Sequence, residues 1–166
     1  GVLARADAHG LQGMSAASPH YALAECVAEP WGQGSVTITG AAGADARQWY
    51  QQTQLPLLPW SGLCGGFFSG RFRRDNLQTF TSGADQRTVR CYCTEDNFRR
   101  LDRAEELAAE KNATLPQIAL AYAICGPLNV FPLTAAYTPQ QARDNAAAAN
   151  IELTDAELAW LDLRSD

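Results

Sequence analysis

Lysine is nearly absent from this chain, and long apolar runs are missing altogether. Lys111 is the only lysine among 13 basic residues, and 18 acidic residues give the 166-residue chain a net charge of −5. This balance argues against nucleic acid as a partner, because phosphate binding needs clustered Lys and Arg. The one small cluster, Arg71, Arg73 and Arg74, fits a solvated loop better. No stretch approaches the ~20 apolar residues that span a bilayer, so we expect no membrane partner.

Cysteine is present but not in a disulfide pattern. Five cysteines, an odd number, lie at scattered positions, which indicates a reducing environment and predicts a cytoplasmic location. The Cys91-Tyr92-Cys93 triplet lacks the spacing of a structural zinc site. Hydrophobic residues make up 46% and charged residues 19%. These values are ordinary for a globular protein, and the length suits one domain over residues 1–166.

The second half of the chain is predicted to be strongly helical. A Thr-x-x-[Glu/Gln] capping pattern begins three apolar-periodic stretches at Thr114, Thr138 and Thr154, and Thr94 is a candidate cap for a fourth. The helix beginning at Thr114 is apolar on nearly every side, which predicts burial. A short apolar strand is expected at 129–136.

The first half is less regular. It predicts a helix end leaving through Gly10, short strands at 12–18 and 35–40, a helix at 44–54 and a buried strand at 55–60. Alternation of strands and helices is typical of an α/β fold whose parallel strands are joined by helical crossovers. The polar stretch 72–93 is expected to be a long connection, functional or mobile.

The segment "LPWSGLCGGFFSGR" (residues 58–71) places a glycine-rich turn directly after the buried strand. Such a turn can cradle a phosphate, because glycine lets backbone N–H groups approach an anion. It can equally be a flexible turn, and the glycines alone do not decide between the two.

The wider context resembles the aldo/keto reductase family. "LPLLPWSGLCGGFFSGRF" (55–72) is similar to the family's strand that ends in an aromatic residue, followed by Ser-Pro-Leu-x-x-Gly and often Gly-Arg. "ATLPQIALAYAICGPLNVFPLTAAYTPQQARDNAAAANIELTDAELAWLD" (113–162) resembles the family's ordered end: a Gln-x-Ala-Leu-Ala-[Trp/Tyr] helix, a Val-x-Pro strand, Thr-Pro before an acidic-Asn pair, and a final Leu-[Thr/Ser]-x-x-Glu-Leu.

This resemblance implies part of a (β/α)8 barrel. Such barrels have about 250 residues or more, which exceeds this chain. By order, residues 14–18, 55–60 and 129–135 resemble the sixth, seventh and eighth strands. The expected fold class is therefore α/β, the C-terminal portion of a TIM barrel with parallel strands and helical crossovers.

The resemblance also implies a nicotinamide dinucleotide site. Trp60 stands where the family's aromatic residue stacks on the nicotinamide ring, and Ser61, Leu63 and Gly65 match the loop that contacts the pyrophosphate. Ser18 stands where the family usually has a Gln that holds the carboxamide.

At the adenine end, Asp144 and Asn145 match the family's acidic-Asn pair. The loop at 134–141 carries no cation for a 2′-phosphate, for which a bidentate Arg is the usual partner. NADP or NAD is therefore the expected cofactor. Gly62 replaces the family's proline after the serine, which predicts a less rigid loop.

The family's catalytic Asp, Tyr, Lys and His belong to the part of the barrel that precedes these strands, so no catalytic residue is assigned here. The resemblance implies an NAD(P)-dependent oxidoreductase, and this chain alone is expected to be inactive. Its partners would be the dinucleotide and the N-terminal barrel half or copies of itself. The alternatives are a non-enzymatic self-assembling module, since open strand edges invite pairing, and a diverged binding module.

Overall fold

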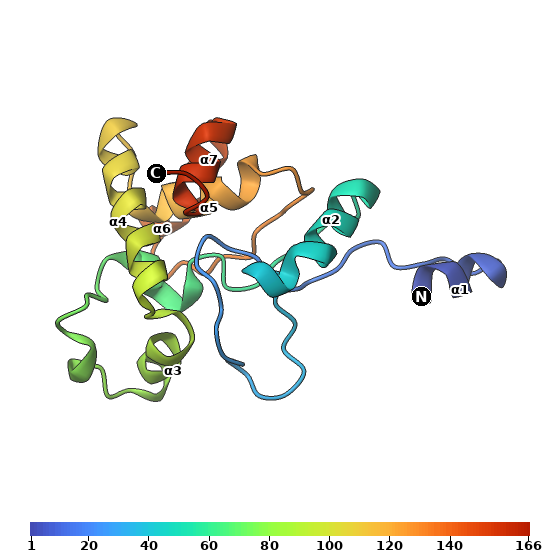
Figure 1. The fold of residues 1–166 in the computed structure, drawn as a ribbon, viewed down its shortest axis with the longest axis horizontal. Coiled ribbons are helices and arrows are strands. Elements are labelled where there is room, and N and C mark those ends of the chain that lie inside the picture. Colours follow the sequence, from blue (N-terminus) through green and yellow to red (C-terminus); the bar gives the residue numbers. More distant parts are fainter.

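The computed structural model describes residues 1–166 and is built mainly of helices (Figure 1). The α-helices are α1 (Val2–Ala8), α2 (Ala44–Thr53), α3 (Gly83–Tyr92), α4 (Glu95–Glu110), α5 (Leu115–Cys125), α6 (Pro139–Ala147) and α7 (Asp155–Leu161). Short 3-10 turns occupy Ala41–Gly43, Cys64–Ser69, Leu77–Thr79 and Ala148–Asn150. Helices α4 to α7 gather on one side, whereas α1 stands apart at the other end of the molecule (Figure 1). No helix combines the length and the apolarity needed to cross a membrane.

The predicted caps at two helix starts are confirmed. Glu157 accepts a hydrogen bond from the backbone N–H of Thr154 at 2.7 Å, and the Thr154 hydroxyl accepts one from the Glu157 N–H at 3.2 Å. Gln117 likewise accepts from the Thr114 N–H at 2.9 Å at the start of α5. These bonds satisfy N–H groups that have no partner inside the helix, so each sequence pattern marks a true helix start.

The capping box predicted at Thr138 is only half formed. The Thr138 hydroxyl accepts from the Gln141 N–H at 3.1 Å, as expected. The Gln141 side chain, however, accepts from the N–H of Tyr137 at 2.8 Å rather than from Thr138. The chain enters α6 from an exposed loop, and this places the Tyr137 N–H within reach of the Gln141 amide.

The extended segments lie side by side in parallel. Single β-bridges join Ala17 with Leu57, Leu57 with Val130, His20 with Trp60, and His20 with Thr37. The order across the molecule is therefore 36–38, 17–20, 57–60 and 130–133. Because parallel strands end at the same edge, the residues that follow Trp60, His20 and Leu133 emerge together.

The bridges do not extend into continuous strands, although the sequence predicts strands at 12–18, 35–40, 55–60 and 129–136. Pro56 and Pro59 have no N–H to donate, and Pro132 interrupts the neighbouring segment in the same way. Their carbonyls and neighbours still pair. The Ala17 N–H donates to Pro56 O at 2.9 Å and the Leu133 N–H to Pro59 O at 2.9 Å.

A single hydrophobic cluster lies between these segments and the helices. Leu57, Phe67, Leu101, Ile118 and Leu161 are fully or almost fully buried in it. The six residues 118–123 of α5 are all buried, which confirms the expectation for this helix. The buried faces of α4 and α5 thus pack, through this cluster, against the extended segments.

The expectation of a long connection at 72–93 is wrong. Helix α3 occupies half of it, and the Ser82 hydroxyl caps α3 by accepting from the Asp85 N–H at 3.1 Å. Thr88, Cys91 and Tyr92 are buried on one face of α3. This face carries a threonine, a cysteine and a tyrosine rather than aliphatic residues, so the helical periodicity is concealed in the sequence.

Candidate cofactor site

The glycine loop after Trp60 is tightly folded, and several of its residues adopt a left-handed backbone conformation. Ser61, Gly65 and Gly66 all have positive φ angles, of 55°, 64° and 89°. The Cys64 N–H donates to Ser61 O at 2.7 Å, and the Gly66 N–H donates to Leu63 O at 3.0 Å. These two bonds close consecutive turns, so the loop has a defined shape rather than that of a slack turn.

Gly65 is fixed by helix α3. The Thr88 hydroxyl donates to Gly65 O at 3.0 Å. A Cβ on Gly65 would lie 2.6 Å from the same Thr88 hydroxyl oxygen, which is closer than real Cβ contacts allow. Glycine is needed here both for its left-handed backbone and for the close approach of α3.

The indole of Trp60 is supported from behind by a buried histidine. The His20 and Trp60 rings lie 4.7 Å apart between centroids, at 42° to one another. His20 Nε2 lies 3.2 Å from the Tyr92 hydroxyl, and His20 Nδ1 lies 3.2 Å from the Thr37 hydroxyl. Burial lowers the pKa of His20 from 6.5 to about 4, because the charged imidazolium would lose its hydration. The ring behind Trp60 is therefore neutral at physiological pH.

The thiols and the phenol near Trp60 are also held neutral. Burial raises the pKa of the Cys64 and Cys26 thiols and of the Tyr92 phenol above their ordinary values. A protonated, buried thiol is a poor nucleophile. This neighbourhood can therefore hold a flat, uncharged ring but offers no activated nucleophile.

A cavity of about 240 Å³ opens beside Trp60. Its other walls come from residues 26–30 together with Ser35 and Thr37. These residues belong to the connection between the extended segments 17–20 and 36–38, and to the start of the second. Trp60 is half-buried, so part of the indole remains open to this space. A planar heterocycle can thus approach the tryptophan from this side.

Ser18 lies next to this edge. Its hydroxyl donates to Leu58 O at 2.6 Å, across the bridge between the neighbouring segments. The residue is exposed. The Ser18 hydroxyl therefore uses its proton in a backbone hydrogen bond, while the residue stays accessible to solvent.

Asp144 and Asn145 lie on α6, which connects to the same edge through residues 132–135. Asn145 donates to Ala135 O at 3.2 Å, and Asp144 accepts from the Gln140 amide at 2.8 Å. At the loop end, a Cβ on Gly62 would lie 3.5 Å from Pro132 Cβ. The glycine loop and the segment that leads to α6 are thus in contact.

The basic residues that follow the glycine loop form ion pairs with carboxylates. Arg71 pairs with Asp85 at 2.8 Å, Arg73 with Glu105 at 2.8 Å, and Arg74 with both Glu95 and Asp102 at 2.9 and 2.8 Å. The guanidinium nearest in sequence to the exposed 134–141 loop is Arg143, which donates to Gln140 at 3.0 Å. Every one of these pairs is on the surface, where such pairs contribute little to stability.

A sequence model of the aldo/keto reductase family matches residues 41–163. The chain belongs to the aldo/keto reductase family. Versiconal hemiacetal acetate reductase from Aspergillus parasiticus is 27% identical over 107 residues, which cover 64% of this chain and 31% of the relative.

Solved aldo-keto reductases share the fold. A thermostable aldo-keto reductase, Tm1743, solved with the inhibitor epalrestat, superposes with a TM-score of 0.53 at 18% identity, over 95% of this chain and 42% of that one. An aldo-keto reductase from Klebsiella pneumoniae, solved with NADPH, gives 0.54 at 24% identity, over 90% of this chain and 39% of that one. The chain thus spans less than half the length of these relatives. Its fold is that of part of a (β/α)8 barrel.

Sequence reasoning missed two features that the structure brings out. His20 and Tyr92 were not expected beside Trp60, because Tyr92 lies in the stretch expected to be a connection. Ser18 and His20 are two residues apart in an extended segment and so lie on the same side. That alternation was the available signal for placing His20 near the site.

Proposed function

We propose that this chain forms the cofactor-binding, C-terminal part of an aldo/keto reductase-like oxidoreductase and binds a nicotinamide dinucleotide. In this proposal, residues 14–18, 55–60 and 129–135 correspond to the sixth to eighth barrel strands, within one domain over residues 1–166. The carrying observation is the parallel order of bridges, which brings Trp60, the glycine loop and the segment leading to α6 to one edge. Ligands of (β/α)8 barrels bind at the carboxyl ends of the strands, and this supports the same edge here.

The cofactor would lie along this edge from Trp60 to α6. Trp60 would stack on the nicotinamide, with Ser18 beside the carboxamide. Ser61, Leu63 and Gly65 would contact the pyrophosphate, and Asp144 and Asn145 would hydrogen-bond the adenine. The neutral His20 ring behind the indole supports this arrangement because it rigidifies Trp60 without adding charge.

Both NADP and NAD remain candidates for the dinucleotide. The solved Klebsiella pneumoniae relatives carry NADPH or NADP, which supports binding of the phosphorylated cofactor. Residues 134–141 supply no cation, and Arg143 is engaged with Gln140. We therefore expect little preference for NADPH over NADH.

The chemical step requires groups that this chain does not supply in the proposed arrangement. Its one lysine, Lys111, pairs with Glu157 at 2.7 Å between the end of α4 and α7. The general acid of such a reductase needs a tyrosine with a lowered pKa, whereas burial raises the pKa of Tyr92. The chain alone is thus expected to bind cofactor without reducing carbonyls.

Fluorescence titration tests the proposal. Adding NADPH or NADH should quench the wild-type emission, and Trp60→Phe should remove most of that quenching. Trp49→Phe is the matched control, since Trp49 is exposed on α2, and it should leave the quenching unchanged. The proposal would be contradicted by equal quenching in the two variants, or by no quenching of the wild type at millimolar cofactor.

Open edges favour a second candidate, a self-assembling module. The segments 36–38 and 130–133 each pair on one side only. Val36, Phe131 and Leu133 on these edges are 62%, 57% and 48% exposed. Unpaired edges with apolar residues attract another strand. Size-exclusion chromatography decides this point, since a monomer at high concentration rules out self-assembly.

A further inference from the structure

A second, larger cavity lies apart from Trp60. It has a volume of about 350 Å³ and is walled by residues 21–23 and 25, the turn 39–41, α2, α4, α5 and the residues after α7. None of the seven residues proposed for the dinucleotide lines it. The volume is within the range of small-molecule sites in proteins.

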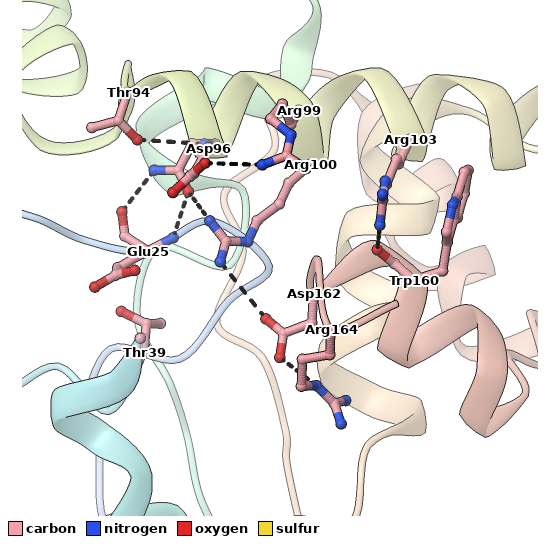
Figure 2. Close-up of polar contacts among 12 residues, drawn as sticks. Glu25, Thr39, Thr94, Asp96, Arg99, Arg100, Arg103, Trp160, Asp162 and Arg164 are labelled. Atoms are coloured by element: carbon pink, nitrogen blue, oxygen red, sulfur yellow. Dashed lines mark hydrogen bonds and ion pairs between the residues drawn. The ribbon is translucent and has the colours of Figure 1, made fainter. Parts of the chain in front are cut away.

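Arginine dominates the charge of this cavity. Its wall contains three guanidinium groups and two carboxylates: Arg47, Arg100 and Arg164, and Glu25 and Asp162. The carboxylate of Glu25 is turned away from the Arg100 guanidinium (Figure 2). Arg47 is exposed only in part and donates to Gly40 O at 2.7 Å, beside the turn that walls the cavity. The balance leaves one positive charge in excess, which favours an anion.

Arg100 is buried with few partners. The residue is only 9% exposed, yet its single close hydrogen bond runs from Nη1 to the Asn97 side-chain oxygen at 3.0 Å. Its Nη2 lies 4.0 Å from Asp162 Oδ1, too far for a hydrogen bond (Figure 2). Its Nε has no partner at all. A buried guanidinium left so poorly paired is costly, and an oxyanion is the group that pairs it best.

Asp162 itself is held by a second arginine. Arg164 Nε donates to Asp162 Oδ2 at 2.9 Å, with the Arg164 side chain 63% exposed at the mouth (Figure 2). Two guanidinium groups therefore share one carboxylate, and Arg164 can turn toward an incoming anion. The Tyr21 and Tyr122 rings, 6.3 Å apart between centroids, add flat apolar surface to the same wall.

We propose that this cavity binds a small organic anion through a carboxylate or phosphate group. Arg100 and Arg164 pair with the oxyanion, and Tyr21 and Tyr122 contact the apolar body of the ligand. The cavity shares no lining residue with the proposed dinucleotide site, so the proposal does not depend on the proposed function.

Calorimetric titration with inorganic phosphate and with benzoate tests this proposal, using chloride at the same ionic strength as the blank. Wild-type chain should bind at least one of the two anions. Arg164→Gln should weaken that binding by about tenfold, and Arg100→Gln should abolish it. Arg99→Gln is the matched control, because Arg99 lies beside Arg100 on α4 but is exposed, pairs with Asp96 and does not line the cavity. It should bind like wild type.

The two anions also separate the two sources of the oxyanion. Binding of phosphate alone supports a phosphorylated ligand, and binding of benzoate alone supports an aromatic or aliphatic acid. If Arg100→Gln fails to fold, Arg164→Gln decides, since its side chain is mostly exposed. The proposal is overturned if wild type shows no heat beyond the chloride blank, or if Arg164→Gln binds as tightly as Arg99→Gln.

Discussion

Acidification should destabilise this chain through His20. The folded chain keeps His20 neutral down to about pH 4, whereas an unfolded histidine takes up its proton near 6.5. Between these two values the unfolded state binds more protons, so the free energy of unfolding falls as the pH falls. The loss begins near pH 6.5 and is complete below about pH 4. Above pH 6.5, His20 contributes no pH dependence.

The magnitude follows from the two pKa values. Each pKa unit corresponds to about 1.36 kcal/mol, so lowering the pKa from 6.5 to about 4 removes roughly 3 kcal/mol of stability at the acid end. His20 is fully buried, so solvent does not screen this effect. That loss is a large share of the stability of an ordinary domain.

Urea unfolding followed by circular dichroism at several pH values measures this loss. Carboxylates titrate in the same range, so the His20 share is the difference in slope between wild type and His20→Asn. His9→Asn is the control, because His9 is exposed at the end of α1. The reasoning is refuted if His20→Asn keeps the wild-type slope, or if NMR shows His20 of the folded chain titrating near 6.5.

Three further substitutions, the first with a matched control, test the fold. Gly65→Ala should cost about 2–4 kcal/mol through its positive φ and the contact with Thr88. Gly66→Ala, whose Cβ would meet only Ser69 Oγ at an ordinary contact distance of 4.0 Å, should cost only about 1–2 kcal/mol in urea unfolding. Asn97→Ala removes a buried amide that bonds Glu25, Tyr92 and Arg100, and its expected cost of roughly 2–4 kcal/mol would be contradicted by an unchanged melting temperature. Thr154→Ala should cost about 1 kcal/mol, and a neutral result would argue against the capping box of α7.

The helical half of the fold could be predicted because its signals are local. Thr114 with Gln117 and Thr154 with Glu157 satisfy their own helix starts, so no distant residue is needed to recognise them. Helix α3 was missed because its buried face is made by Thr88, which binds the glycine loop, rather than by aliphatic residues. A helix that holds a neighbouring loop by a hydrogen bond leaves little hydrophobic periodicity in the sequence.

The candidate sites likewise combine residues that a local sequence pattern reveals with residues that only packing brings together. Trp60 and Gly65 follow one another in a recognisable pattern, so sequence reasoning reached the loop. The support of the indole comes from His20 and Tyr92, 72 residues apart in the chain. The cavity proposed to bind an anion likewise depends on Arg100 of α4 lying close to Asp162 at the end of α7. Contacts of this kind are formed only by packing, and no local pattern encodes them.

The central claim, that this chain binds a nicotinamide dinucleotide at Trp60, is tested most directly by NMR of the tryptophan indole N–H groups during titration with NADPH. The chain has four tryptophans, at positions 31, 49, 60 and 160, so each signal can be assigned by substitution to Phe. The account predicts that the Trp60 signal shifts upfield through ring stacking while the other three stay in place. A Trp60 signal that does not move at saturating NADPH, or four signals that move together, would contradict it.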